Sequence, residues 1–190
     1  MTAAEILSVE PLHEGWSTFS LARFRLKDGA VVERFVEDHG HAVCVLPYDP
    51  VRGVALMVRQ LRAPVRLAGE DEFPEPPAGI LEPGEDPADC GRREVMEETG
   101  VRLGALEPLG CYWSSPGVTT EKTHLFLASY GAADRIGEGG GTDWDEHVEV
   151  LELPLSELAA RLDRGALADV KLFGLVLSLM RRRPELFSKG

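Results

Sequence analysis

Residues 79–101 read GILEPGEDPADCGRREVMEETGV, and this stretch decides the fold. Asp86 followed by Pro87 predicts the start of a helix, because aspartate is a good N-cap and proline needs no hydrogen-bond donor at the first helical position. Gly100 predicts its end, because glycine readily adopts the left-handed conformation that terminates helices. The stretch therefore predicts a loop that leads into one well-delimited helix.

Three carboxylates lie on one turn of this helix. Glu94, Glu97 and Glu98 stand at i, i+3 and i+4, so their side chains project from the same face. They repel each other, and with no His or Cys beside them they suit a hard cation, Mg²⁺ or Mn²⁺, better than zinc. A solvated acidic face is the alternative in an acidic chain. The full spacing from Gly79 to Val101 favours the metal site, because a long motif seldom arises by chance.

The same spacing resembles the signature of the Nudix hydrolases at every position: Gly79-x5-Glu85-x7-Arg93-Glu94-Val95-x-Glu97-Glu98-x-Gly100-Val101. The resemblance implies an α/β fold, an α/β/α sandwich with a mixed sheet that hydrolyses nucleoside diphosphates linked to another moiety. It implies that Mg²⁺ (or Mn²⁺) is bound by the carboxylates of Glu94, Glu97 and Glu98 and by the Ala78 carbonyl. It also implies that Arg93 pairs with Glu85 and holds the loop against the helix.

Composition limits the possible partners and the compartment. The chain has 190 residues, 44% of them hydrophobic, and a net charge of −12. This charge argues against nucleic acids and anionic membranes as partners, and it means that an anionic substrate needs metal ions and local Arg or Lys. Cys44, Cys90 and Cys111 show no CxxC spacing, which predicts reduced thiols in a cytoplasmic protein. We identify no signal peptide, and the longest apolar run, residues 172–180, is too short for a bilayer.

The N-terminal region predicts a small antiparallel sheet ahead of the catalytic domain. Residues 5–11 and 17–38 alternate as strands do, and Asp28-Gly29 is a hairpin signal. We therefore divide the chain into an N-terminal β region, residues 1–38, and a Nudix domain, residues 39–190. The resemblance implies a homodimer in which the N-terminal region is a dimerisation arm. Trp16 is either a packing residue or an aromatic that stacks on a base.

The remaining periodicity predicts strands and helices of the sandwich. Strands are expected at residues 41–47, 53–60, 106–113 and 124–128. Amphipathic helices are expected at residues 155–162 and 169–182, both covering one face of the sheet.

Two short segments resemble the ADP-ribose pyrophosphatase subgroup of the Nudix family. Glu75-Pro-Pro-Ala-Gly79 enters the motif, and Pro116 of Ser-Ser-Pro-Gly117 lies sixteen residues beyond Gly100. The resemblance implies hydrolysis of ADP-ribose to AMP and ribose 5-phosphate. A similar segment occurs in GDP-mannose hydrolases, so GDP-mannose, another nucleoside diphosphate sugar or a dinucleotide remains an alternative. A nucleotide sensor without activity is a minor alternative, because such proteins typically lose the carboxylates that this chain keeps.

Two further residues are candidates for substrate binding. Arg62 follows a strand and can grip a phosphate or lie as a surface charge. Relatives acting on ADP-ribose carry Gln-aromatic-Arg here, with Leu61 replacing the aromatic in this chain, and this resemblance favours the substrate role. Glu121 either contacts the substrate or caps a turn.

The general base is expected in the Gly-rich segment of residues 131–147. Such a segment predicts a flexible loop that closes over a substrate. Its resemblance to relatives whose loop glutamate is the base makes Glu146 the choice. Asp143, Asp145 and Glu138 remain alternatives, because gap placement in a Gly-rich loop is ambiguous.

Overall fold

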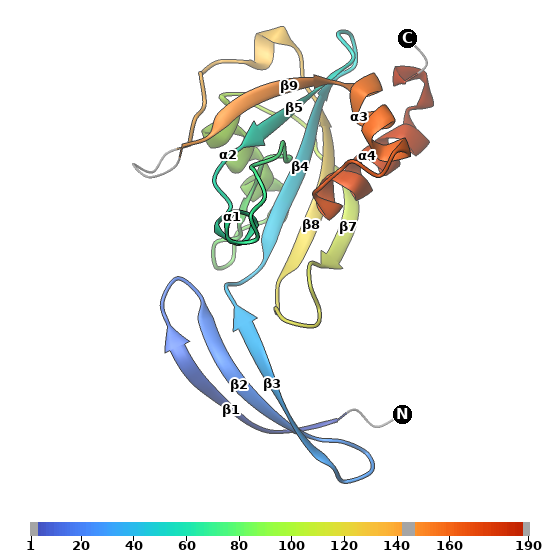
Figure 1. Cartoon of the computed structure of the whole chain (residues 1–190). Helices are drawn as coiled ribbons and strands as arrows, with labels where there is room; N and C mark the ends of the chain where they lie inside the picture. The colour runs from blue at the N-terminus through green and yellow to red at the C-terminus, as the bar shows by residue number, and fades with distance from the viewer. Residues whose placement is uncertain (1–3, 142–146, 188–190) are drawn as a thin grey trace. The chain divides into compact units, whose positions relative to one another are not determined.

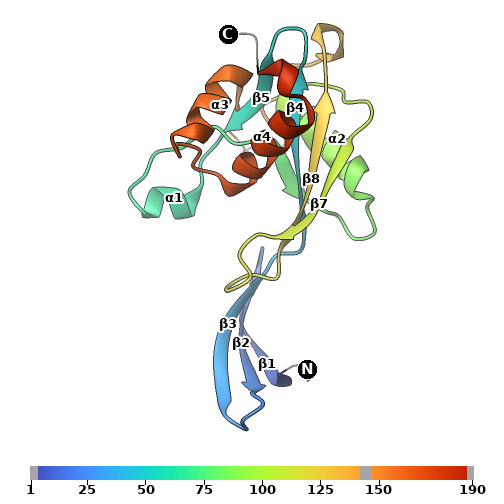
Figure 2. The same ribbon diagram turned by 90° about the vertical axis from the view of Figure 1, so that its right-hand side faces the viewer.

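The computed structural model describes residues 4–141 and 147–187 (Figures 1 and 2). Within this range the chain forms two compact units. The first, called here the β-sheet unit, combines Met1–Ala42 with Tyr112–Thr123. The second, the main unit, combines Val43–Cys111 with His124–Gly190. The division at residue 38 that we expected from the sequence stays a prediction. In the structure, residues 112–123 belong to the same compact unit as the N-terminal sheet.

The β-sheet unit is built on three antiparallel strands in the order β1-β2-β3. They are β1 (Glu5–Glu14), β2 (Thr18–Arg25) and β3 (Val31–Asp38). Asp28 and Gly29 form the predicted turn between β2 and β3, with Gly29 at φ +86° and the Asp28 side chain accepting the Ala30 N–H at 3.0 Å. Glycine is required there because L side chains rarely adopt a positive φ. The predicted small antiparallel sheet is confirmed.

This sheet contains few buried residues. All ten residues of β1 are exposed, and in the three strands Ser20 and Ala22 alone are buried. Ile6, Val9 and Phe35 expose more than half of their surface. A three-stranded sheet needs an apolar face that is covered to be stable. The β-sheet unit therefore presents exposed apolar side chains, a pattern that is typical of interaction surfaces.

The main unit contains a six-stranded sheet with a central path of β7-β8-β4-β5-β9 and a short β6 paired with β4. The strands are β4 (Ala42–Asp49), β5 (Val54–Arg59), β6 (Ala78–Ile80), β7 (Glu107–Trp113), β8 (Lys122–Ser129) and β9 (Glu149–Pro154). β5 is antiparallel to both β4 and β9. The strands predicted at residues 41–47, 53–60, 106–113 and 124–128 are confirmed, with shifts of a few residues at their ends.

Helices cover both faces of this sheet (Figures 1 and 2). The helices are α2 (Pro87–Thr99), α3 (Leu155–Asp163) and α4 (Val170–Arg182). Every residue of β4 is buried, and successive side chains of a strand point to opposite faces. Val43 and Val45 accordingly belong to the core cluster with Val95 of α2, whereas Cys44 packs with the residues of α3 and α4. The α/β/α sandwich is confirmed, and so is the prediction that both C-terminal helices share one face.

Three short helical segments were not expected from the sequence. They are α1 (Ala63–Leu67), η1 (Ala132–Asp134) and η2 (Pro184–Leu186). Each is three to five residues long, too short for a hydrophobic period to be visible.

Cys44, Cys90 and Cys111 are free thiols. No helix of the described residues is long and apolar enough to cross a bilayer.

Candidate functional site

Helix α2 begins and ends where the sequence predicts. The Asp86 side chain caps its N-terminus by accepting the Ala88 N–H at 2.8 Å and the Asp89 N–H at 3.3 Å. At the other end Gly100 is left-handed, with φ 70°, and its N–H donates to the Met96 carbonyl at 2.9 Å. Both caps satisfy backbone groups that the helix itself leaves free. They fix the angular position of the acidic turn.

Arg93 links the loop before α2 to the acidic face of the helix. Its Nε and Nη2 donate to the two oxygens of Glu85 at 3.0 and 3.1 Å. Its Nη1 donates to Glu94 at 2.7 Å and to Glu97 at 3.1 Å. The hydrogen bonds from Arg93 lower the pKa of Glu85 to about 2. One guanidinium therefore holds the loop and balances the charge of two helix carboxylates.

Glu98 has a different environment from the other two acids. Its side chain is buried, with Oε2 accepting the Ala78 N–H at 3.2 Å and Oε1 lying 3.4 Å from the Gln60 amide nitrogen. Burial raises the pKa of Glu98 to about 8, and the nearby charge of Glu94 adds to the effect. The carboxylate thus lies where a cation would stabilise its charged form.

Gly79 of strand β6 allows Glu94 to approach the backbone. A Cβ atom built on Gly79 would lie 1.9 Å from the Glu94 Cδ, so the Glu94 carboxylate would have to move away. Glycine at this position therefore allows the carboxylate to keep its place. The contact sets Glu94 directly beside the short strand that carries Ala78.

The donor chemistry of this turn fits a hard divalent cation. Its groups are carboxylates and, at Ala78, a backbone carbonyl, and oxygens are the ligands that Mg²⁺ and Mn²⁺ prefer. Among the described residues no group of three His, Cys, Asp or Glu side chains is arranged as a ready ligand set. Arg93 instead binds the Glu94 and Glu97 oxygens. The assignment of the metal ligands stays a prediction.

Comparison with known proteins decides the family. The model of the NUDIX domain matches residues 38–173, which is most of the chain. The chain belongs to the Nudix family. It is therefore a hydrolase of the Nudix class, as its signature predicted.

Relatives of similar length carry more specific names. A GDP-mannose pyrophosphatase of Cronobacter sakazakii is 39% identical over 169 residues, covering 87% of this chain and 86% of the relative. A GDP-mannose pyrophosphatase of Pectobacterium atrosepticum is 36% identical over 192 residues, covering 98% and 97%. Among solved structures, one described as an ADP compounds hydrolase superposes with a TM-score of 0.77 at 18% identity, covering 100% of this chain and 98% of that one. This last likeness supports the Nudix fold.

Next to the Nudix motif, the Arg62 side chain is hydrogen-bonded to Glu75. Its Nε and Nη2 donate to the two oxygens of Glu75 at 2.7 and 3.0 Å. Glu75 is buried, and its backbone pairs with Val58 of β5 through two hydrogen bonds of 2.8 Å. The Arg62 side chain keeps 41% of its surface exposed. One edge of the guanidinium is thus used internally, and binding of substrate by the other edge stays a prediction.

A charge pair at the start of α4, formed by buried Asp169 and half-buried Lys171, was not predicted from the sequence. Asp169 caps this helix, and its Oδ1 accepts the backbone N–H of Lys171 at 2.8 Å and the Lys171 ammonium at 3.1 Å. Burial alone would lower the pKa of Lys171, but the charge of Asp169 outweighs it and the pKa is raised. The sequence signal was an aspartate before an apolar period, which indicates a cap but not burial of a charge pair.

The Gly-rich segment is docked on the end of the Nudix helix. The N–H groups of Ile136 and Gly137 donate to the Gly100 carbonyl at 2.9 and 3.1 Å. Those of Gly140 and Gly141 donate to the Glu98 and Glu97 carbonyls at 2.9 and 3.3 Å. Residues 136–141 are therefore fixed by backbone hydrogen bonds, in contrast to the flexible loop that we expected.

The predicted general base falls largely outside the described residues. Glu146 and its alternatives Asp143 and Asp145 lie between residues 142 and 146, which the structure does not describe. Glu138 is described and exposed. The choice among these acids stays a prediction.

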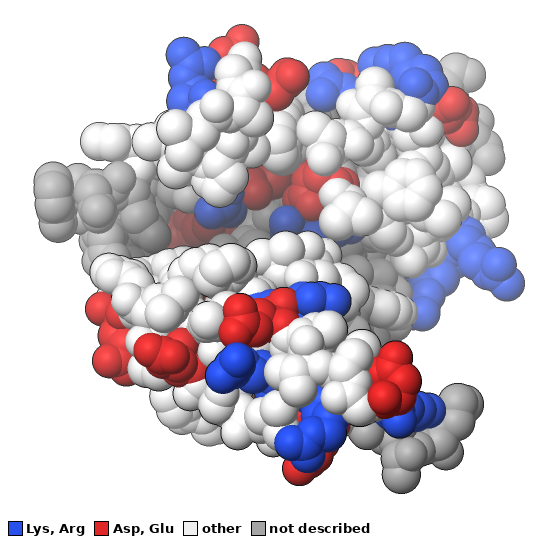
Figure 3. All heavy atoms as spheres, turned by 60° about the horizontal axis from the view of Figure 1, so that its bottom comes forward, with Lys and Arg blue, Asp and Glu red and all other residues white. Residues whose placement is uncertain are grey.

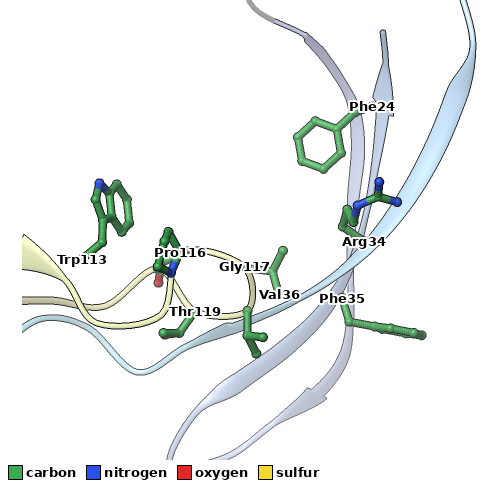
Figure 4. Close-up of a pocket in the computed structure, with 10 residues that line it drawn as sticks. Phe24, Arg34, Phe35, Val36, Trp113, Pro116, Gly117 and Thr119 are labelled. Carbon is green, nitrogen blue, oxygen red and sulfur yellow. The ribbon is translucent and has the colours of Figure 1, made fainter. Parts of the chain in front are cut away.

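Pro116 and Glu121 lie in the β-sheet unit. Pro116 lines a cavity of about 360 Å³, together with Phe24, Arg34, Trp113 and Thr119 (Figure 4). Glu121 is largely buried, and both of its oxygens are hydrogen-bonded within this unit. The contact of either residue with a substrate stays a prediction.

Surface charges of opposite sign are interspersed. On the face drawn in Figure 3, acidic and basic side chains alternate with uncharged ones. Ion pairs also connect neighbouring strands of the β-sheet unit, for example Arg25 with Glu5 at 2.8 Å and Arg23 with Glu33 at 3.1 Å. Exposed pairs of this kind contribute little to stability, about 0–1 kcal/mol each.

Proposed function

We propose that this Nudix hydrolase cleaves the diphosphate bond of a nucleoside diphosphate sugar in a reaction that depends on Mg²⁺ or Mn²⁺. The observation that carries the proposal is the acidic turn of α2, where Glu94 and Glu97 share one arginine and Glu98 is buried with a raised pKa. Its oxygen donors suit a hard cation, and a diphosphate is the substrate group that such a cation binds. The named relatives, which are pyrophosphatases of one such sugar, support the substrate class.

The residues of the acidic turn and of the loop before it have two roles, binding the cation and orienting its ligands. Glu94, Glu97, Glu98 and the Ala78 carbonyl would hold the cation, which when bound activates water and neutralises charge on the diphosphate. Arg93 and Glu85 orient the acidic turn, because the arginine bonds to both the loop and the helix.

Glu146 is the proposed general base, with Asp143, Asp145 and Glu138 as alternatives. Its role is to take the proton of the attacking water, a contribution of roughly 10²–10⁴-fold. The hydrogen bond from the Gly141 N–H to the Glu97 carbonyl supports this proposal, because it places residue 141, which directly precedes residues 142–146, at the acidic turn. Arg62, Pro116 and Glu121 are the proposed contacts to the substrate.

Of the possible substrates, we propose GDP-mannose first. The two relatives cover nearly the whole chain at 36–39% identity and are GDP-mannose pyrophosphatases. ADP-ribose is the second candidate, supported by Pro116 sixteen residues beyond Gly100 and by the Glu75-Pro-Pro-Ala-Gly79 segment. Cleavage of the diphosphate would give GMP and mannose 1-phosphate from the former, and AMP and ribose 5-phosphate from the latter.

A substrate panel tests the proposal. The purified protein with Mg²⁺ is offered GDP-mannose, ADP-ribose, ADP-glucose and flavin adenine dinucleotide, and kcat/KM and products are measured for each. We expect the highest kcat/KM for GDP-mannose, with GMP as a product. A clear preference for ADP-ribose would reverse our order of substrates and keep the reaction. Absence of turnover with Mg²⁺ and with Mn²⁺ would refute the proposed reaction and support a sensor.

We also propose that the protein is a homodimer joined through the β-sheet unit. The fully exposed β1 and its apolar side chains Ile6, Val9 and Leu12 support this proposal, because an uncovered sheet of three strands is at best marginally stable. A second copy of the chain is the simplest partner with a matching surface.

The cytoplasmic location and the lack of a nucleic-acid partner remain predictions from composition.

A further inference from the structure

His39 lies between two carboxylates in the β-sheet unit. Its Nδ1 lies 2.8 Å from each oxygen of Glu37, and its Nε2 lies 2.6 Å from Glu121 Oε2. The imidazole side chain is only 14% exposed. The indole of Trp16 stacks on it, with ring centroids 5.1 Å apart and an interplanar angle of 17°. No sequence motif singled out this histidine.

This geometry favours the doubly protonated ring. Ionised carboxylates only accept hydrogen bonds, and a neutral imidazole carries one N–H, so it can donate to one carboxylate at a time. Simultaneous donation from both ring nitrogens requires the doubly protonated imidazolium. In that state His39 is a largely buried cation that bridges two acids.

The bridge connects three segments of the unit. Glu37 is the penultimate residue of strand β3, Trp16 lies between β1 and β2, and Glu121 ends the loop that carries Pro116. The other oxygen of Glu121 accepts hydrogen bonds from the hydroxyls of Ser114 and Thr123. Glu121 thus closes the base of the 114–121 loop, and His39 fastens that base to β3.

We propose that His39 is a positioning residue for substrate binding, which as an imidazolium fixes the 114–121 loop to strand β3 through Glu121. This inference rests on the proposed function, in which that loop contacts the nucleoside diphosphate sugar. The loop is also held by backbone hydrogen bonds, from Glu37 N–H to the Val118 carbonyl at 2.9 Å and from Thr120 N–H to the Glu37 carbonyl at 3.0 Å. His39 adds the side-chain tie, which can be removed without breaking these bonds.

The tie depends on pH in a defined direction. Burial alone lowers the pKa of His39, but the hydrogen bonds to Glu121 and Glu37 outweigh it and raise the pKa above 6.5. Of the charged groups near the ring, Glu37, Glu121 and Asp38 are acidic, and His41 is the other titratable base. The tie is therefore complete below pH 6.5 and is lost as the pH rises through the pKa of His39 in the folded protein.

The first test needs no substrate. NMR of ¹⁵N-labelled imidazoles, assigned with His39→Gln, is expected to show His39 doubly protonated at pH 6. His39→Gln is also expected to increase hydrogen exchange of the amides in residues 114–121 at that pH. His13→Gln, at an exposed position of β1, serves as the matched control and should leave that exchange unchanged. A neutral His39 at pH 6, or unchanged exchange in His39→Gln, overturns the proposal.

The second test asks whether the tie acts on binding. His39→Gln is expected to raise KM for the preferred substrate about tenfold, with kcat unchanged within about twofold. The ratio of the two KM values should approach one as the pH rises through the pKa of His39, because the wild-type tie is then lost as well. The His39→Gln effect should also be largely absent in a Glu121→Gln background, since His39 acts through Glu121. A change confined to kcat, or a pH-independent KM ratio, contradicts the positioning role.

The two tests separate the inference from the proposed function. Failure of the wild-type protein to hydrolyse any substrate overturns the proposed function and, with it, the role of His39 in substrate binding. The NMR and exchange results would still decide whether His39 ties the loop. Normal hydrolysis with an unchanged KM in His39→Gln overturns the inference alone.

Discussion

At the scale of single residues, Glu98 is more deeply buried than the other acids of its turn. It is 7% exposed, whereas the carboxylates of Glu94 and Glu97 both accept hydrogen bonds from Arg93. Charging a buried carboxylate costs free energy unless a cation offsets it, so this position favours a role for Glu98 beside a cation.

We predict that Glu98→Gln lowers kcat/KM by about three orders of magnitude or more, because a ligand of the cation is lost and the cation supplies several kcal/mol. The fold should be kept, since glutamine has the same shape. Activity with Mg²⁺ and thermal unfolding with and without Mn²⁺ are the measurements. The wild-type unfolding temperature should rise with the metal ion, and that of the variant should not.

Asp89→Asn is the matched control on the same helix. Asp89 is exposed and pairs with Arg92 at 2.6 Å on another part of the helix surface. Its activity and metal response should equal those of the wild type. Full activity of Glu98→Gln would show that the metal ligands are assigned wrongly.

Some contacts of the site could be predicted from the sequence because they lie within one motif, whereas contacts between distant residues could not. Glu85 and Arg93 lie in one contiguous motif, whose resemblance to the Nudix signature implied their pairing, and the structure places them together. His39 and Glu121 are 82 residues apart, and only the tertiary fold brings them into contact. Arg62 and Glu75 are closer in sequence, but no periodic pattern links a loop arginine to a loop acid.

At the scale of elements, helix α2 and the Gly-rich segment form one backbone-to-backbone contact. A Cβ built on Gly100 would lie 2.2 Å from the Gly137 carbonyl oxygen. A Cβ on Gly139 would lie 2.4 Å from the Glu98 carbonyl oxygen. The helix end and the segment can approach this closely because both sides lack side chains.

We predict that Gly100→Ala destabilises the protein by about 1–3 kcal/mol, because alanine is strained at φ 70° and its Cβ collides with the Gly137 carbonyl. Urea unfolding followed by circular dichroism measures the change. Gly104→Ala is the control, since a Cβ there meets nothing within 4 Å, and it should shift stability by less than about 0.5 kcal/mol. Equal stability of the two variants would refute the tight contact.

Some elements could be predicted from a local sequence pattern alone, and others could not. Helix α2 was predicted to the residue because Asp86, Pro87 and Gly100 are strong caps. The five-residue α1 was missed, since it buries none of its residues and so has no apolar period. The docking of residues 136–141 was missed as well, because glycine composition alone indicates freedom and does not reveal a tertiary contact.

At the scale of the whole molecule, the proposed dimer follows from the exposed apolar side chains of the β-sheet unit. We predict that the wild-type protein has twice the chain mass of 20.8 kDa in light scattering after size exclusion. Val9→Glu should shift the mass toward a monomer, because a charge replaces an exposed apolar group on β1.

Val51→Glu is the control for that prediction. Val51 is 89% exposed and lies outside the β-sheet unit, in the turn between β4 and β5. It should leave the mass of the wild type unchanged. A monomeric wild-type protein at micromolar concentration would contradict the dimer and would require another cover for the sheet.

The docking of the Gly-rich segment has a consequence for engineering this enzyme. Exchange of loops between relatives is a usual way to transplant specificity, and it succeeds only where the graft begins beyond fixed backbone. Here Gly141 is the last described residue bonded to the helix, through the Glu97 carbonyl. A graft that starts after Gly141 keeps the contacts of the helix end intact. A graft that starts at Arg135 replaces residues 136–141, whose backbone N–H groups donate to carbonyls at the end of α2.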